Sequence, residues 1–174
     1  DEPRWIEHKT KDPKKSSAEL HALIFEMLSA NKFEMKNVKR IFYCSGPGSY
    51  TGMRVSEGIV NIMDWQKFQF NSFYHFEVPK FCKVETGTWY SKAFKGENFI
   101  YHWNKDAHKK SLVKESELVF EGEVFSFENE GDVLGTSEMI FKNSKLVFSS
   151  VFGQNLKRDL YYYRPLEKEF SRKI

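Results

Sequence analysis

Two segments in the first half of the chain place apolar residues three and four positions apart. The first, residues 16–31, carries Leu20, Leu23, Ile24, Met27 and Leu28 at this spacing. The second, residues 49–66, carries Met53, Ile59, Val60 and Met63. This spacing follows the 3.6 residues per turn of an α-helix, so we predict two amphipathic helices.

Shorter apolar runs lie on either side of these helices. Residues 39–45 and 67–73 are rich in residue types that favour strands, and residues 4–10 alternate between apolar and polar positions. Runs of this length and composition indicate β-strands. The resulting order of strand, helix, strand, helix and strand predicts an α/β lobe.

The pattern changes after Pro79. We predict strands at 80–85 and 119–127, a β-hairpin over 88–103 with its turn at Lys95–Glu97, and helices at 110–118 and 136–152. We therefore divide the chain into two small lobes, residues 1–78 and 79–174.

A glycine-rich turn, GPGSYTG, precedes the second helix. Gly46 and Gly48 permit unusual backbone angles, and Ser49 suits the N-cap position. The start of a helix carries partial positive charge, and Arg54 lies in the first turn, so Gly46, Gly48, Ser49, Thr51 and Arg54 form a candidate anion site. The alternative is a rigid turn that only positions a packing helix.

The turn departs from three motifs that hold phosphates or nucleophiles. A P-loop needs a lysine after its second glycine, but Met53 follows Gly52. A dinucleotide fingerprint needs a third glycine where this chain has Thr51. The nucleophile elbow around Ser49 fails because Pro47 and Thr51 take its glycine positions. The turn therefore lacks the residues that perform the chemistry of each motif.

Composition and charge narrow the function classes. Apolar residues make up 40% and charged residues 29%, as in ordinary soluble globular proteins. The 17 Phe residues are not interleaved with clustered Arg, which favours a core or a buried interface over base stacking. A dispersed net charge of +3 is weak for a dedicated nucleic-acid surface, although the lysine clusters at 9–15 and 105–110 leave tRNA binding as an alternative.

Cysteine and histidine usage predicts a cytoplasmic protein without a metal. Cys44 and Cys82 lack C-x-x-C spacing and cannot form a disulfide framework, so a reducing compartment is expected. The histidines include no pair at helical metal-ligand spacing, and Cys44 fits best as a small buried hydrophobe. No apolar run has the length of a membrane span.

Residues 46–55 resemble the signature of the TsaB (YeaZ) family, G-P-G-S-[FY]-T-G-[LMV]-R-[IV], at every position. Three weaker similarities accompany it: SSAELHALIFEMLSA resembles the family's "HS…LLPLI" helix, ETGTWYSKAF its "DARRGEVYxAxF" strand, and LYYYRPLE its "YLRPP" segment. The family's first strand, with its "IDTS" segment, has no counterpart, and the sequence begins without Met. We therefore expect a divergent or N-terminally truncated member.

The resemblance implies an actin-like, ribonuclease-H-like fold of two α/β lobes, the first lacking its first strand. It also implies a non-catalytic, dimer-forming subunit without a cofactor, which partners a TsaD-type catalytic subunit and a TsaE-type ATPase. That assembly makes threonylcarbamoyladenosine (t6A) in tRNA, which this subunit meets through the complex only. The alternative is a small phosphate- or nucleotide-binding protein of the same fold that uses the turn at 46–54.

In that family the two helices form the docking surface, which here points to eight interface residues: Leu20, Leu23, Ile24, Met27, Gly52, Met53, Ser56 and Val60. The small residues Gly48, Gly52 and Ser56 lie four apart, and a glycine inside a helix costs about 1 kcal/mol relative to alanine. The two glycines inside the predicted helix, Gly52 and Gly58, indicate that something approaches this helix surface closely.

Overall fold

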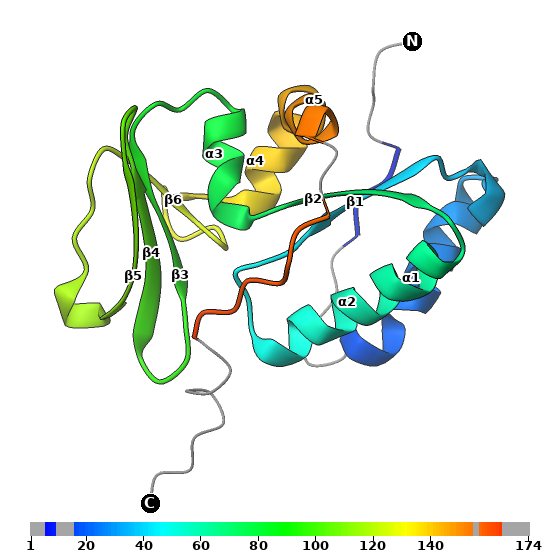
Figure 1. Ribbon diagram of the computed structural model, residues 1–174, viewed down its shortest axis with the longest axis horizontal. Coiled ribbons are helices and arrows are strands. Elements are labelled where there is room, and N and C mark those ends of the chain that lie inside the picture. Colours follow the sequence, from blue (N-terminus) through cyan, green and yellow to red (C-terminus); the bar gives the residue numbers. More distant parts are fainter. Residues whose placement is uncertain (1–5, 10–15, 155–156, 165–174) are drawn as a thin grey trace, which may run out of the picture.

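The structure is a computed structural model that describes residues 6–9, 16–154 and 157–164, and its strands form two sheets (Figure 1). In the first sheet, β1 (Arg40–Cys44) and β2 (Gln69–Phe73) run parallel. The second sheet has the strand order β5-β4-β3-β6-β7. Its strands are β3 (Gly87–Lys92), β4 (Glu97–Trp103), β5 (His108–Lys114), β6 (Glu123–Ser126) and β7 (Leu134–Gly135).

Pairing in the second sheet is mixed. The strands β3, β4 and β5 form antiparallel neighbours, whereas β6 pairs in parallel with β3 and β7 with β6. The turn between β3 and β4 uses positive φ angles at Lys95 and Gly96. Mixed pairing is common in the larger sheets of α/β and α+β folds.

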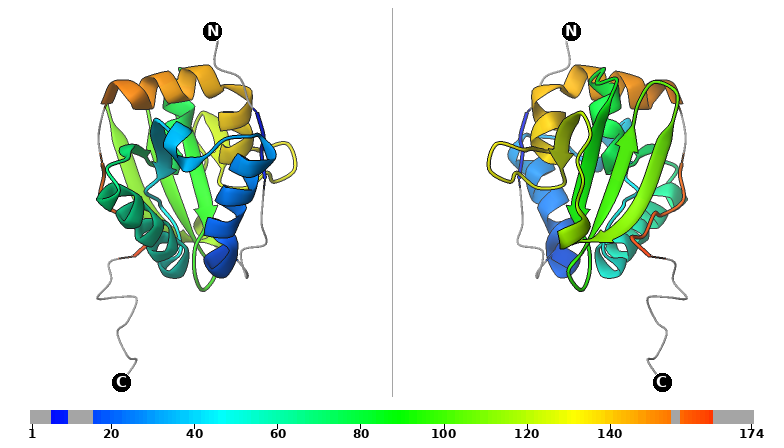
Figure 2. Two further views of the ribbon diagram at one scale, coloured as in Figure 1. Left: turned by 90° about the vertical axis from the view of Figure 1, so that its right-hand side faces the viewer. Right: turned by 90° about the vertical axis from the view of Figure 1, so that its left-hand side faces the viewer.

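Helices separate and flank the two sheets. On one side of β1 and β2 lie α1 (Ser16–Ala30) and α2 (Tyr50–Trp65), as Figure 2 shows from the side. Between β2 and the second sheet lie α3 (Val78–Phe81), α4 (Thr136–Lys142) and α5 (Ser144–Gln154). Short 3₁₀ turns occur at Met35–Asn37, His75–Glu77 and Glu115–Glu117. The first sheet is therefore covered on both faces, as parallel strands generally are.

An aromatic core lies between the second sheet and the central helices. Its buried aromatic members are Phe73, Phe76, Trp89, Phe99, Tyr101, Trp103 and Phe125. Val147 and Val151 of α5 are fully buried against it. These aromatic side chains stabilise the fold, since each of them removes a large apolar area from water. Residues from both sides of the predicted lobe boundary at 78/79 contribute to this core. The division into two lobes stays a prediction.

Most of the predicted elements in the first half are confirmed. The helices expected at 16–31 and 49–66 are α1 and α2, and the strands expected at 39–45 and 67–73 are β1 and β2. Ser49 is the N-cap of α2, and its Oγ accepts a hydrogen bond from the Gly52 N–H at 3.3 Å. The strand expected at 4–10 is not formed by residues 6–9, and residues 4, 5 and 10 lie outside the described chain.

Two predictions after Pro79 are wrong. The strand expected at 80–85 is replaced by α3, in which Pro79 occupies a first-turn position where its missing N–H removes no helical bond. The helix expected at 110–118 is replaced by β5 and the short turn that follows it. Antiparallel pairing of β5 with β4 extends the hairpin, and this tertiary contact outweighs a weak local helical pattern.

The last two predictions are confirmed in part. Only Glu123–Ser126 of the strand expected at 119–127 pairs as β6. The helix expected at 136–152 is two helices, α4 and α5, which are separated at Asn143. The hairpin over 88–103 is confirmed as β3 and β4, with its turn at Lys95–Glu97.

Candidate interaction site at the glycine turn and the two helices

The glycine turn is packed against a segment near the C-terminal end of the described chain. Gly46 has a φ of 117°, and a Cβ at this position would lie 2.2 Å from the Tyr161 carbonyl oxygen. The Tyr161 N–H donates to the Ser45 carbonyl at 2.7 Å, and Gly48 forms a parallel β-bridge with Tyr162. The His75 N–H donates to the Gly46 carbonyl at 2.8 Å. The turn therefore receives backbone from two other parts of the chain.

Two of the three polar side chains of the predicted anion site, those of Ser49 and Arg54, are engaged within the chain. Ser49 caps α2, and Thr51 is exposed. Arg54 pairs with Glu57 at 2.5 Å, and its guanidinium lies 5.5 Å from the ring centroid of Tyr50. The hydrogen bond to Glu57 raises the pKa of Arg54 above its ordinary value. Gly46, Gly48, Ser49, Thr51 and Arg54 are close together in space, and an anion site among them stays a prediction.

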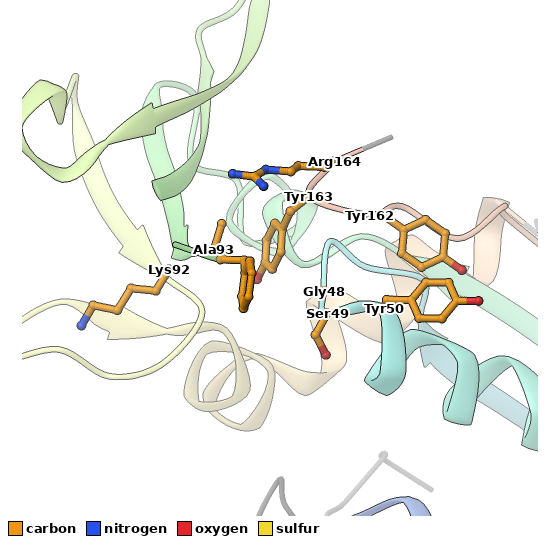
Figure 3. A pocket seen from close by; sticks show the side chains of 9 residues that line it. Gly48, Ser49, Tyr50, Lys92, Ala93, Tyr162, Tyr163 and Arg164 are labelled. Carbon is orange, nitrogen blue, oxygen red and sulfur yellow. The ribbon is translucent and has the colours of Figure 1, made fainter. Parts of the chain in front are cut away.

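A small pocket opens beside the turn (Figure 3). It has a volume of about 210 Å³ and is lined by Gly48, Ser49, Tyr50, Lys92, Ala93, Phe94, Tyr162, Tyr163 and Arg164. The rings of Tyr50 and Tyr162 lie side by side with centroids 5.7 Å apart, next to Ser49. Arg164 forms an ion pair with Glu97. The pocket brings the turn together with β3 and the C-terminal segment.

A larger cavity of about 560 Å³ lies between the start of α2 and the second sheet. Among the side chains that line this cavity, Glu130 contacts two others. It accepts a hydrogen bond from the Tyr90 hydroxyl at 2.9 Å and forms an ion pair with Lys92 at 3.0 Å. The hydrogen bond from Lys92 lowers the pKa of Glu130. Ser91 Oγ and the Tyr163 hydroxyl lie 2.6 Å apart. These polar groups satisfy one another within the protein.

The cavity also contains a cysteine and a histidine. Burial raises the pKa of the Cys44 thiol to about 12 and lowers the pKa of His75 to about 4. The His75 Nδ1 atom is enclosed and has no hydrogen-bond partner among the described residues. At neutral pH the pair is therefore a thiol beside a neutral imidazole, whereas a nucleophilic cysteine requires the thiolate.

An apolar groove runs between α1 and α2 along β1. It has a volume of about 280 Å³. Its lining residues are Leu20, Ile24 and Leu28 of α1, Ser56, Ile59, Val60 and Met63 of α2, and Met35, Val38, Ile41, Phe42 and Tyr43. Large hydrophobic side chains on the same helices are exposed, including Phe25 at 56% and Ile62 at 61%. Exposed apolar side chains beside an apolar groove are typical of an interaction surface.

The structure divides the eight predicted interface residues into three groups. Leu23, Met53 and Val60 are buried within the chain itself. Leu20, Ile24, Met27 and Ser56 are half-buried, and Gly52 is exposed. Four of the eight (Leu20, Ile24, Ser56 and Val60) line the groove. Sequence reasoning named Leu28, Ile59 and Met63 as part of the apolar stripes but did not place them in the site.

A metal site and a membrane-spanning helix each have structural requirements, and the described residues meet neither set. Among the described residues, no group of three His, Cys, Asp or Glu side chains is arranged to hold a metal ion. None of the helices in the described part of the chain has the length and apolar character needed to cross a bilayer.

Comparison with known proteins places the fold. No protein-family model matches the sequence, and no curated protein matches it. Solved structures that are similar in fold include the following two. One is described as an uncharacterized protein with similarity to peptidase YeaZ from Pseudomonas aeruginosa. It is 13% identical, covers 84% of this chain and 83% of its own, and has a TM-score of 0.58. The other is YeaZ from Pseudomonas aeruginosa, at 12% identity over 78% of this chain and 79% of its own, with a TM-score of 0.53.

This chain has the YeaZ fold. Similarity at this level of identity concerns the arrangement of the backbone, and it agrees with the actin-like, ribonuclease-H-like fold expected from residues 46–55.

Proposed function

We propose that this chain is a non-catalytic TsaB-type subunit that binds a TsaD-type catalytic subunit through the α1–α2 groove. A TsaE-type ATPase joins the assembly, and the assembly makes t6A in cytoplasmic tRNA. In the absence of its partner the chain uses the same face to form a homodimer. The observation that carries the proposal is the apolar groove between α1 and α2, in a protein with the YeaZ fold and the GPGSYTGMRV motif.

The chemistry of the described residues supports a binding role. The cavity beside the glycine turn holds a protonated thiol and a neutral imidazole at physiological pH, and its Tyr90, Lys92 and Glu130 side chains bond to one another. Catalytic groups usually have pKa values matched to their task and polar atoms aimed at a substrate. The groove, by contrast, offers apolar surface that a partner can bury.

The energy of docking comes from the half-buried side chains of the groove. Completing the burial of Leu20, Ile24 and Ile59 contributes part of the roughly 1.5–3 kcal/mol that fully burying each such side chain yields. The loss of translational and rotational freedom on association opposes this gain. The small side chain of Ser56 in the groove lining leaves room for a partner side chain.

The test compares two α2 variants that carry the same new charge. Ser56→Arg places a long cation in the groove, and its flexible stem can reach water in the isolated monomer. Asn61→Arg places the same residue on α2 outside the groove lining. We expect wild type and Asn61→Arg to bind a TsaD-type subunit alike, and Ser56→Arg to bind at least 10-fold more weakly. Light scattering after size-exclusion chromatography and titration calorimetry measure this difference.

A second measurement addresses the role in tRNA modification. Threonylcarbamoyl transfer to tRNA by the reconstituted assembly should fall with Ser56→Arg and stay unchanged with Asn61→Arg. Circular dichroism melting curves check that both variants fold. Equal binding by the two variants, or a wild-type chain that stays monomeric with every partner, contradicts the proposal.

A further inference from the structure

On a second surface of the molecule, two lysine ammonium groups and one arginine guanidinium lie close to aromatic rings. Side chains from β5, α3, the His75–Glu77 turn and the segment 157–164 meet there around a group of aromatic rings. Lys110 of β5 stands directly opposite Tyr101 of β4 in the antiparallel register, so the two side chains share a face of the sheet. This surface has no residue in common with the groove between α1 and α2.

Four rings surround the ammonium group of Lys110. Its Nζ lies 4.6 Å from the ring centroids of both Phe76 and Tyr161. The centroids of Tyr74 and Tyr101 lie 5.9 Å and 6.0 Å away. Ammonium groups within about 6 Å of a ring centroid are attracted by the negative face of the ring. The rings therefore fix the position of the Lys110 ammonium.

Two more cations reach the same rings. The Lys80 Nζ donates a hydrogen bond to the Tyr101 hydroxyl at 2.6 Å and lies 4.9 Å from the Tyr101 ring centroid. The Arg158 guanidinium lies 5.0 Å from the Tyr74 ring centroid. Lys80, Lys110 and Arg158 therefore form a cluster, which we call the cationic cluster.

The acidic residues at this surface do not balance the cationic cluster. Glu77 pairs with Arg158, and the other Glu77 carboxylate oxygen accepts the Tyr74 N–H at 2.8 Å. Asp159 is a further acid whose charge reaches Tyr74. Neither Lys80 nor Lys110 forms an ion pair with any described residue. Burial is the main cause that lowers the pKa of both lysines. The charge of Glu77 raises the pKa of both, and Arg158 and Lys80 lower that of Lys110 further.

We propose that the cationic cluster binds a phosphate group. The three cations exceed the two acids Glu77 and Asp159, and the net positive charge that remains attracts a phosphate monoester, which carries about −1.5 to −2 charges at neutral pH. Compact ammonium groups such as those of Lys80 and Lys110 bind phosphate as point charges. The phosphate belongs either to a free phosphate compound or to a nucleic-acid backbone. Base stacking is not part of the site, because the ammonium groups lie over the ring faces.

The purely structural reading of the same lysines predicts a different outcome. A lysine stem can cover an apolar core edge while its ammonium reaches water, without binding any ligand. Lys110→Met keeps the apolar stem and removes the charge, so it preserves the covering role and abolishes the phosphate contact. Lys80→Met does the same on α3. Lys109→Met is the matched control, since adjacent residues of a strand point to opposite faces.

The experiment titrates the full chain with inorganic phosphate, pyrophosphate and a labelled single-stranded RNA oligonucleotide at low salt. We expect wild type and Lys109→Met to bind phosphate or pyrophosphate within about twofold of each other, and Lys110→Met and Lys80→Met to lose at least 10-fold in affinity. Melting curves establish that each variant folds. Equal affinities for all four proteins, or no binding of any probe by wild type, would overturn the proposal.

The two sources of phosphate give different patterns in the same titration. If the site takes a nucleic-acid backbone, the oligonucleotide binds with a steep salt dependence whose logarithmic slope falls by about 1 in Lys110→Met. If it takes a free phosphate compound, pyrophosphate binds and the oligonucleotide does not. Both results support a phosphate site, and neither depends on whether the α1–α2 groove binds a TsaD-type subunit.

Discussion

Gly46 lies in the turn before α2 and Gly58 lies inside α2, and the two glycines differ in how much space surrounds them. Gly46 has a φ of 117°, and a Cβ there would meet the Tyr161 carbonyl oxygen at 2.2 Å. Gly58 lies inside α2 with no neighbouring heavy atom within 4 Å of its would-be Cβ. Only Gly46 therefore depends on the absence of a side chain.

Alanine at the two positions should change stability in opposite directions. Gly46→Ala combines an unfavourable φ with a clash against backbone, and we expect it to lower the free energy of unfolding by about 2–5 kcal/mol. Gly58→Ala should raise it by about 0.5–1 kcal/mol, because alanine favours the helix more than glycine does. Urea denaturation followed by circular dichroism measures both. A neutral Gly46→Ala would show that the turn does not pack against Tyr161 as described.

His75 makes the stability of the fold depend on pH. Its ring stacks on Trp89 with centroids 6.2 Å apart and meets Phe127 edge-on at 4.7 Å, while its Nδ1 atom has no partner among the described residues. Burial lowers its pKa from 6.5 to about 4 in the folded state. Below pH 6.5 the unfolded chain therefore binds a proton that the folded chain excludes, and stability falls until the pH approaches 4.

His75→Phe should remove this dependence and keep the ring contacts. We expect wild type to lose on the order of 2 kcal/mol more than His75→Phe between pH 7 and pH 4, a figure reduced to allow for the partial exposure of the side chain. Denaturation at a series of pH values measures the difference between the two proteins, so that other titrating groups cancel. Parallel stability curves would mean that His75 is protonated alike in both states.

At the scale of elements, the sequence predicted helices and strands wherever local pattern and tertiary role agree. The apolar spacing that identifies α1 and α2 is the same spacing that packs them, and Ser49 caps α2 through its own hydroxyl. Prediction from the sequence failed at β5, which is a strand because it pairs with β4. It also failed at α3, whose helical conformation depends on packing against the surrounding core. The local pattern of apolar and polar residues does not reveal contacts between segments that are distant in the sequence.

The candidate site was predictable to a similar extent. The resemblance pointed to α1 and α2, but the helical spacing could not tell which side of each apolar stripe faces the chain's own core. Leu23, Met53 and Val60 proved to be buried. The packing of Tyr161 and Tyr162 on the glycine turn was not predictable either, because it joins segments more than 100 residues apart.

Substitutions of two hydrophobic residues on α1 can test which side of the helix faces the core. Leu23 is 8% exposed and Phe25 is 56% exposed. We expect Leu23→Ala to lower the free energy of unfolding by about 2–4 kcal/mol, because it leaves a cavity in the core. Phe25→Ala should change it by less than about 0.5 kcal/mol, as is usual for exposed positions. Chemical denaturation measures both changes, and similar losses in the two variants would contradict the described orientation of α1.

At the scale of the whole molecule, the segment 157–164 connects parts that are distant in sequence. Arg158 pairs with Glu77, and Arg164 pairs with Glu97 of β4. Between them, the backbone of Tyr161 bonds to Ser45 at the end of β1. This segment therefore contacts both the first sheet and the second, and we infer that it helps the two sheets to unfold together.

Tyr161 is the residue through which this coupling can be tested. Its ring packs against those of Tyr74, Phe76 and Phe99, with centroid distances of 5.6, 5.8 and 5.6 Å. Tyr161→Ala removes all three ring contacts, and we expect a loss of about 2–4 kcal/mol in the free energy of unfolding. Tyr161→Phe keeps the ring and should cost less than about 1 kcal/mol.

Hydrogen exchange distinguishes a shared effect from a local one. If the segment couples the sheets, Tyr161→Ala should speed the exchange of the protected amides of β1 and of β4 to the same degree, since both then open through one cooperative step. Tyr161→Phe should leave both rates close to those of wild type. Faster exchange confined to β4 would show that the Tyr161 ring stabilises only the second sheet, and that the bond to Ser45 does not transmit its effect to the first.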